Sequence, residues 1–101
     1  MIMRIVCFRF KKGTSEEKIQ AHMDHFARFA KEIPVIRSCS GGRVVSGEKG
    51  APPEYHSAHY LTFAREEDLD VYFDHPAHLD FIEKHKAIWE PGVLVLNAKA
   101  E

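Results

Sequence analysis

The sequence is poor in cysteine and contains no long hydrophobic run. Its two cysteines, Cys7 and Cys39, are too few for the disulfide framework of a small secreted domain. No apolar stretch approaches the roughly 18 residues of a membrane-spanning helix. Residues 1–8 lack the basic lead and cleavage site of a signal peptide. We therefore expect a cytoplasmic protein without a membrane partner, with both thiols reduced; a reactive thiol is the alternative.

Positive charge of the kind that binds nucleic acid is also absent. The chain carries 14 Lys and Arg against 15 Asp and Glu, with no basic patch, so we expect no nucleic-acid partner. No glycine-rich phosphate loop, dinucleotide fingerprint or catalytic-triad order is present. These absences argue against nucleotide-dependent enzymes and serine hydrolases, and we expect no cofactor.

What the chain does have is enough apolar material for one small core. Its 101 residues are 45% hydrophobic, which predicts one folded domain over residues 1–101 rather than disorder. A domain of this size buries only about 60–70% of the surface of its unfolded chain. A partner subunit would therefore help to complete the core.

Hydrophobic periodicity predicts the order strand, helix, strand, strand, helix, strand. The strands are expected at residues 3–10, 36–46, 55–63 and 93–98, and the helices at 14–33 and 65–89, with an interruption at Pro76. Two split βαβ units of this kind make an α+β, ferredoxin-like βαββαβ fold. We expect a four-stranded antiparallel sheet with two helices on one face.

Finer features of these elements can also be predicted. Thr14 and Glu17 fit a capping box, and Gly41 with Gly42 indicates a bulge, a bend or a close backbone approach. The residues expected to face inward are Ile19, Met23, Phe26, Ala30 and Ile33 in the first helix, and Leu69, Phe73, Leu79, Ile82 and Trp89 in the second. His22 and His25 are expected at the surface.

The first and last strands are apolar on both faces, although two helices can cover only one face. An apolar sheet face left in water marks an interface. We therefore expect a homodimer in which two sheets face each other and close an eight-stranded barrel.

Four segments carry a family resemblance, namely 8–11 (Phe-Arg-Phe-Lys), 13–17, 32–36 and 72–81, the last of which contains His-Pro-Ala-His and precedes Trp89. In this order they resemble the stress-responsive A/B barrel (Dabb) family over nearly the whole chain. The resemblance implies a dimeric α+β barrel whose cellular role is undefined. It also implies a small-molecule pocket between the sheet and the helices.

A plant polyketide cyclase of the same fold implies an enzymatic alternative, an aldol-type ring closure, and a cofactor-independent monooxygenase is a variant of it. The cyclase uses a His and a Tyr that match His78 and Tyr72. Imidazole titrates near neutral pH and suits a general base, while a phenol can hydrogen-bond a developing oxyanion. The chain differs from its relatives in carrying Arg4 where the cyclase has a His. It also has His56-Ser57 where many members have Asp-His.

Each candidate site residue also has a structural interpretation. His75 and His78 can cap the helix restart and fill a polar slot, or bind a ligand; a metal site is disfavoured because no further ligands complete a set with zinc spacing. Tyr72 and Trp89 can be core or interface residues.

Three further residues are candidate ligand contacts. His56 and His59 lie on opposite faces of a strand, so one of them is expected to face the pocket. Arg4 lies among apolar neighbours and needs a partner, either a ligand carboxylate or an intersubunit salt bridge.

Overall fold

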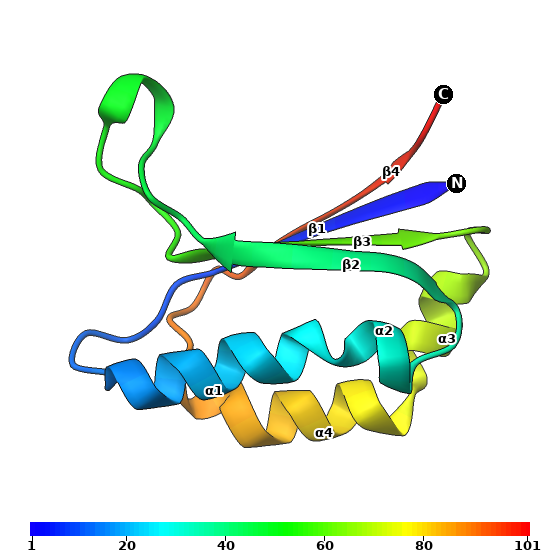
Figure 1. Cartoon of the computed structure of the whole chain (residues 1–101), viewed down its shortest axis with the longest axis horizontal. Coiled ribbons are helices and arrows are strands. Elements are labelled where there is room, and N and C mark those ends of the chain that lie inside the picture. The colour runs from blue at the N-terminus through cyan, green and yellow to red at the C-terminus, as the bar shows by residue number, and fades with distance from the viewer.

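The computed structural model describes residues 1–101, and its elements follow the predicted order (Figure 1). They are β1 (Ile2–Phe8), α1 (Glu16–Ala27), α2 (Phe29–Glu32), β2 (Ile36–Arg43), the 3-10 turn η1 (Glu48–Gly50), β3 (Ser57–Phe63), α3 (Asp68–Asp74), α4 (Pro76–His85), the 3-10 turn η2 (Lys86–Ile88) and β4 (Leu94–Lys99). No helix is long and apolar enough to cross a membrane.

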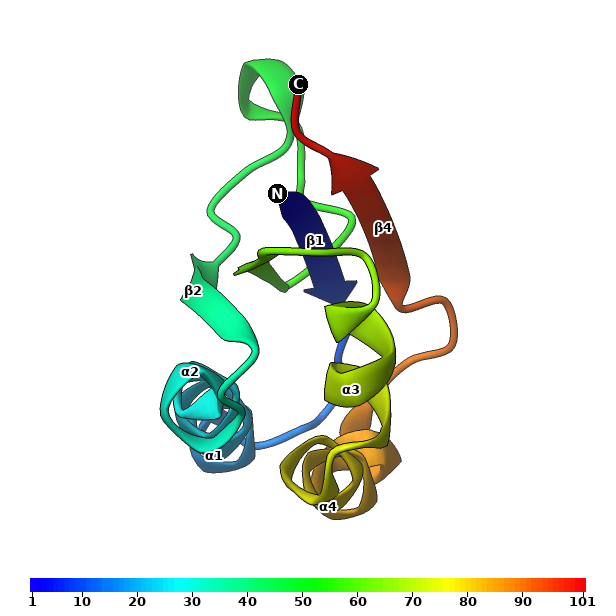
Figure 2. The same cartoon turned by 90° about the vertical axis from the view of Figure 1, so that its right-hand side faces the viewer.

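The four strands form one antiparallel sheet in the order β2-β3-β1-β4. All the helices lie on the same side of this sheet, with α1 and α2 beneath one half and α3 and α4 beneath the other (Figure 2). The predicted α+β ferredoxin-like fold is therefore confirmed.

Strand β1 lies in the sheet interior and alternates between the two faces. Ile2, Val6 and Phe8 are buried against the helices, and Arg4 shares that face because side chains alternate with a period of two. The opposite, outer face carries Met3, Ile5 and Cys7 on β1. On β4 it carries Leu94 and Leu96, which pair with Cys7 and Ile5. Leu96 is 53% exposed, so this outer face is apolar and uncovered in the single chain.

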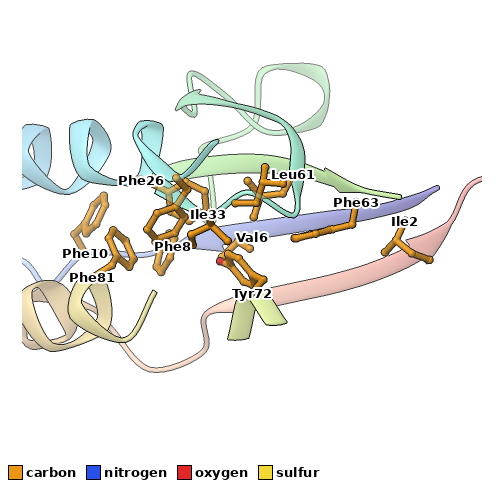
Figure 3. Close-up of a cluster of buried hydrophobic side chains, with 12 residues drawn as sticks. Ile2, Val6, Phe8, Phe10, Phe26, Ile33, Leu61, Phe63, Tyr72 and Phe81 are labelled. Carbon is orange, nitrogen blue, oxygen red and sulfur yellow. The ribbon is translucent and has the colours of Figure 1, made fainter. Parts of the chain in front are cut away.

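A cluster of twelve buried side chains fills the space between the sheet and the helices. Its members are Ile2, Val6, Phe8, Phe10, Phe26, Phe29, Ile33, Ile36, Leu61, Phe63, Tyr72 and Phe81. In Figure 3 the rings of Phe8, Phe26 and Phe81, from β1, α1 and α4, lie side by side toward one end of the cluster. Edge-to-face packing dominates, as between Phe26 and Phe81, whose ring centroids are 5.5 Å apart.

The start of α1 differs from the expected capping box. Ser15, not Thr14, is the N-cap, and its hydroxyl accepts a hydrogen bond from the Lys18 amide at 3.2 Å. The Thr14 hydroxyl instead donates to the Lys11 carbonyl at 2.6 Å. The Lys-Lys-Gly turn therefore uses the threonine, and the helix begins one residue later than the capping box predicts.

The buried side of the first helical region is also shifted from the prediction. The residues below 2% exposure are His22, Phe26, Phe29 and Ile33, a series spaced by four, three and four. His22 is fully buried and His25 is 5% exposed, so the prediction that both lie at the surface is wrong. A neutral imidazole can pack as an aromatic ring, and His22 lies edge-on to Phe8 at a centroid distance of 4.6 Å.

In the second helical region the inward prediction is wrong at two positions. Phe73 and Leu79 are 56% and 47% exposed, whereas Tyr72 and Phe81 are 2% exposed. Apolar residues stand next to one another in this sequence, so two helical faces fit the pattern equally well. The direction in which each short helix beside Pro76 runs decides which of these two faces is buried.

The glycines of β2 confirm one of the expected alternatives, a close backbone approach. A Cβ atom at Gly41 would lie 2.7 Å from Nδ1 of His59 on the neighbouring strand. The register irregularity of β2 lies elsewhere, between Ile36 and Ser38.

Candidate functional site

The site begins at the break between α3 and α4. His75 is extended (φ −63°, ψ 136°), and its Nδ1 accepts a hydrogen bond from the Ala77 amide at 3.0 Å. Pro76 occupies the first turn of α4, where its missing amide costs nothing. His75 therefore caps the helix restart, as one of its two interpretations predicted.

This capping bond frees a backbone carbonyl. In a continuous helix the Ala77 amide would bond to the Phe73 carbonyl four residues earlier, but here it bonds to His75 instead. The Phe73 carbonyl lies 2.9 Å from Nδ1 of His78. A carbonyl can only accept, so Nδ1 of neutral His78 must carry the proton. Nε2 of His78 is then left with a free lone pair.

Beside this break lies a cavity of about 180 Å³, between the helix-facing side of the sheet and helices α3 and α4. Most of its lining is apolar. The lining residues are Arg4, Val6, Phe8, Phe26, Tyr72, Phe73, His78, Phe81, Ile82, Trp89, Val93 and Val95. Figure 3 shows one wall, where Tyr72 points from α3 toward Val6 of β1.

Tyr72 presents a neutral hydroxyl at this cavity. Its ring centroid is 4.4 Å from that of His78, and the residue is 2% exposed. Burial raises the pKa of Tyr72 to about 12, and the neighbouring charge of Arg4 opposes that rise. The phenol therefore remains a hydrogen-bond donor across the physiological range.

His78 is held in its neutral form. Burial lowers its pKa below the ordinary value of 6.5, the Phe73 carbonyl opposes this effect, and the charge of Arg4 lowers the pKa further. A neutral imidazole whose tautomer is fixed by a backbone carbonyl can accept a proton at Nε2.

Arg4 is the cation of the site. Its guanidinium lies 5.2 Å from the centroid of the Tyr72 ring, and Nη1 donates to Oδ1 of Asn97 at 3.0 Å. Nε of Arg4 is buried without a hydrogen-bond partner. Arg4 takes part in none of the ion pairs of the structure.

Four predicted site residues, Arg4, Tyr72, His78 and Trp89, meet at this cavity, and three do not. His56 lies outside it, stacks on Phe10 and accepts a hydrogen bond from the Phe10 amide at 2.9 Å. His59 lines a different cavity between α1 and β2, and His75 caps α4. No group of three or more His, Cys, Asp or Glu side chains is arranged to hold a metal ion.

Most of the cavity wall could not be predicted from the sequence. Val6, Phe8 and Phe81 were assigned to strands and helices, but nothing in their spacing showed that a space would remain between them. The signal that existed was the His-Pro break, since a helix interrupted beside the sheet leaves room at the interruption.

A second unpredicted feature is a group of buried and half-buried histidines between α1, α4 and β3. Nδ1 of His25 and Nε2 of His85 are 2.9 Å apart, and the ring of His22 lies 5.3 Å from that of His85. Neither nitrogen of His22 has a hydrogen-bond partner. Burial, with neighbouring histidines adding to it, lowers the pKa of His22 to about 3; burial lowers that of His59 to about 4.

Comparison with known proteins adds family and fold relatives. The stress-responsive A/B barrel domain profile matches residues 2–98. Olivetolic acid cyclase of Cannabis sativa is 22% identical over 89 residues, which are 88% of this chain and 87% of the cyclase. A protein from Arabidopsis thaliana superposes with a TM-score of 0.85 and 27% identity, over 100% of this chain and 96% of that one.

Two further solved structures share the fold. Hydroxynitrile lyase from Passiflora edulis has a TM-score of 0.84 at 20% identity and covers 96% of this chain and 90% of its own. A protein from Thermobifida fusca has a TM-score of 0.81 at 16% identity, with 98% and 90% covered. The latter is a dimeric ferredoxin-like protein of unknown function.

Proposed function

Because the chain belongs to the stress-responsive A/B barrel domain family, matching it over residues 2–98, we propose that it is a homodimer that binds a small molecule in the cavity between the sheet and helices α3 and α4. The observation that carries the ligand proposal is the convergence of Arg4, Tyr72 and His78 on an otherwise apolar space. An apolar pocket with a few convergent polar groups is the usual form of a small-molecule site.

The second copy in this proposal covers the outer face of the sheet. That face carries Met3, Ile5 and Leu96 and has no helix over it. Exposed apolar patches favour association, and several structures of the same fold are dimeric. Two sheets meeting through these faces could close an eight-stranded barrel.

A charge on the outer face tests the dimer. We expect Leu96→Glu to shift the protein from two chains to one in sedimentation, because it would place a carboxylate in the apolar interface. Leu79→Glu is the matched control, since Leu79 is 47% exposed but lies on α4, on the other side of the sheet. An unaltered protein that sediments as a stable single chain at micromolar concentration would contradict the homodimer.

A ligand screen by thermal shift tests the site. A ligand that binds the native state raises its melting temperature. We expect hits whose shift is reduced in Tyr72→Phe and His78→Ala and unchanged in His56→Ala, because His56 lies outside the cavity. Hits that are indifferent to the first two variants would place binding elsewhere.

A second candidate function is acid–base catalysis on a small carbonyl or aromatic compound. It is favoured by one observation: Nε2 of His78 keeps its lone pair while the neutral hydroxyl of Tyr72 lies beside it. His78 would remove a proton next to a carbonyl, and Tyr72 would donate a hydrogen bond to the oxygen that becomes negative. A polyketide-cyclase-like aldol closure or a cofactor-independent oxygenation would fit these roles.

Two relatives support an enzymatic role, since one is named a cyclase and another a lyase. The test is single-turnover kinetics on a compound from the screen that the protein converts. We expect His78→Ala to lose about 10²-fold or more in rate, the usual contribution of a positioned general base. Turnover by His78→Ala at the rate of the unaltered protein would show that His78 is not the general base.

A further inference from the structure

Arg4 is a partly buried cation without an anion. It projects from β1 toward the helices, and its hydrogen bond to Asn97 is to a neutral amide. Nε of Arg4 is shielded from water and unpartnered. Burying part of a charge without a counterion costs free energy, so such a residue indicates a partner that the chain itself does not supply.

A second subunit is a poor source for that partner. Arg4 lies on the same face of β1 as Ile2 and Val6, which are buried beneath the helices. The second copy proposed above would cover the opposite face, where Met3 and Ile5 point. An intersubunit salt bridge would therefore have to pass through the sheet, which leaves a ligand anion as the partner.

The volume of the cavity, which is partly open to solvent, limits how much of a ligand it can enclose. Its volume of about 180 Å³ is well below the roughly 300–1,000 Å³ of sites for drug-sized molecules. A cavity of about 150 Å³ lined by apolar side chains is known to hold one benzene molecule. The space therefore suits one six-membered ring with one small substituent.

We propose that the ligand is a carboxylate attached to a single planar ring, with the carboxylate held by Arg4 and the ring against the apolar wall. This inference rests on the proposed ligand-binding function and names its chemical class. The guanidinium matches a carboxylate through two parallel hydrogen bonds. Phe8, Phe81 and Trp89 supply aromatic surfaces for the ring.

The two other polar groups agree with this orientation. The hydroxyl of Tyr72 is near enough to Arg4 for the guanidinium to lower its pKa against the effect of burial, and it can donate to the carboxylate. Nε2 of neutral His78 carries a lone pair and would repel a carboxylate oxygen. The anion is therefore directed toward Arg4 and away from His78.

The fluorescence of Trp89 gives a direct measurement. Trp89 is the only tryptophan of the chain and lines the cavity. We would titrate the unaltered protein with benzoate, with benzamide as a neutral molecule of nearly the same shape, and with acetate as an anion without a ring. We expect benzoate to change the emission and to bind at least tenfold more tightly than either control.

Variants of Arg4 then test whether its positive charge holds the benzoate. We expect Arg4→Gln to weaken benzoate binding by about tenfold or more, the size expected for a charge-assisted hydrogen bond, and to change benzamide binding by less than twofold. Arg4→Lys keeps the positive charge but cannot form two parallel hydrogen bonds with a carboxylate. It should therefore weaken benzoate binding less than Arg4→Gln does. Arg28→Gln, an exposed arginine at the end of α1, is the control and should leave benzoate binding unchanged.

The outcomes separate this inference from the function it rests on. Benzamide binding as tightly as benzoate would overturn the inference and leave a small-molecule site in place. Acetate binding as tightly as benzoate would show that the ring adds nothing to binding, and it would overturn the inference that the ligand contains one. Failure of benzoate to bind would also overturn the inference, whereas the proposed function falls only if the thermal-shift screen finds no ligand sensitive to Tyr72→Phe or His78→Ala. The two-ligand comparison on the unaltered protein needs no variant to fold.

Discussion

The two βαβ halves of this chain differ in how their helical regions are interrupted. In the first half, α1 and α2 are separated only by Arg28, which itself keeps a helical conformation (φ −82°, ψ −8°). In the second half, α3 and α4 are separated by an extended residue, His75, followed by Pro76. The first break hardly disturbs the helix, whereas the second turns the chain.

This difference explains where two of the three polar groups of the site come from, the third being Arg4 of β1. Along the first half, buried rings such as Phe26 and Phe29 lie against the sheet. At the second break, a freed carbonyl orients His78, and Tyr72 ends up on the other side of the same break. A helix interruption can therefore build a site out of groups that a continuous helix would use internally.

The largest effect should come from removing a ring on which both halves depend. We expect Phe81→Ala to lower the free energy of unfolding by about 3–5 kcal/mol, the usual cost of deleting a buried aromatic ring. Phe29→Ala should cost about as much in the first half. Urea denaturation measures both, and Phe73→Ala is the control because Phe73 is 56% exposed.

Only Phe81→Ala should also change ligand binding, since Phe81 lines the cavity and Phe29 does not. Equal effects of the two variants on a bound ligand would contradict the assignment of Phe81 to the cavity wall and of Phe29 to the core alone.

The next effect concerns pH and belongs to the first half. Burial lowers the pKa of His22 from 6.5 to about 3. Between pH 6.5 and about pH 3, His22 is therefore protonated in the unfolded chain and neutral in the folded chain. Stability therefore falls as the pH drops below 6.5. His22 alone accounts for roughly 2–3 kcal/mol at about pH 4.5.

His22→Leu should reduce this dependence without abolishing it while keeping most of the buried volume, because burial also lowers the pKa of His59 to about 4. The measurement is the free energy of unfolding by urea at a series of pH values. Leu79→Ala, at an exposed apolar position on α4, is the control and should leave the dependence unchanged. An equally steep acid loss in His22→Leu would show that other groups control it.

A smaller effect separates the two helix caps. We expect His75→Ala and Ser15→Ala each to cost about 1 kcal/mol, because each removes the acceptor of an N-cap hydrogen bond. Only His75→Ala should disturb the site, since the Ala77 amide would then be free to bond to the Phe73 carbonyl. His75→Asn, which restores a capping side chain, should recover most of the stability.

The readout for the site is the tautomer of His78, measured by nitrogen NMR of the imidazole. The unaltered protein and Ser15→Ala should show a proton on Nδ1. If His75→Ala shows the same Nδ1 proton in the same proportion, the cap does not position His78.

The smallest effect is electrostatic. Burial is the main cause of the lowered pKa of His78, and the charge of Arg4 adds to it. Arg4→Gln should therefore raise the pKa of His78, but burial should still hold it below its ordinary value. An NMR titration of the His78 ring measures this shift, and a fall in the pKa would contradict the assigned proximity.

The order of elements could be predicted because it depends on strong local signals. Alternation marked the strands, and Pro34 and Pro76 marked helix ends. The buried helix faces were harder to predict. Tyr72 and Phe73 are adjacent and both aromatic, so a helical pattern alone leaves open which of them faces the sheet.

The site could be predicted only in part. The resemblance brought His78 and Tyr72 forward together, but the bond from His78 to the Phe73 carbonyl is a backbone event that residue types do not encode. The burial of His22 was not predicted, for another reason. Histidine is usually placed at the surface on polarity alone, whereas here its ring packs edge-on against Phe8 and Phe10 although neither nitrogen has a hydrogen-bond partner.

The close approach of Gly41 to His59 ties the two positions together through shared space. Any side chain at position 41 would meet the imidazole ring at 2.7 Å, and the carbonyl of Ala58 at 2.9 Å leaves little room to retreat. A shorter side chain at position 59 would remove only the contact with the imidazole, because the Ala58 carbonyl is backbone and would stay in place. A Gly41→Ala variant should therefore be less destabilising in a His59→Ser background than alone, but it should still cost stability there.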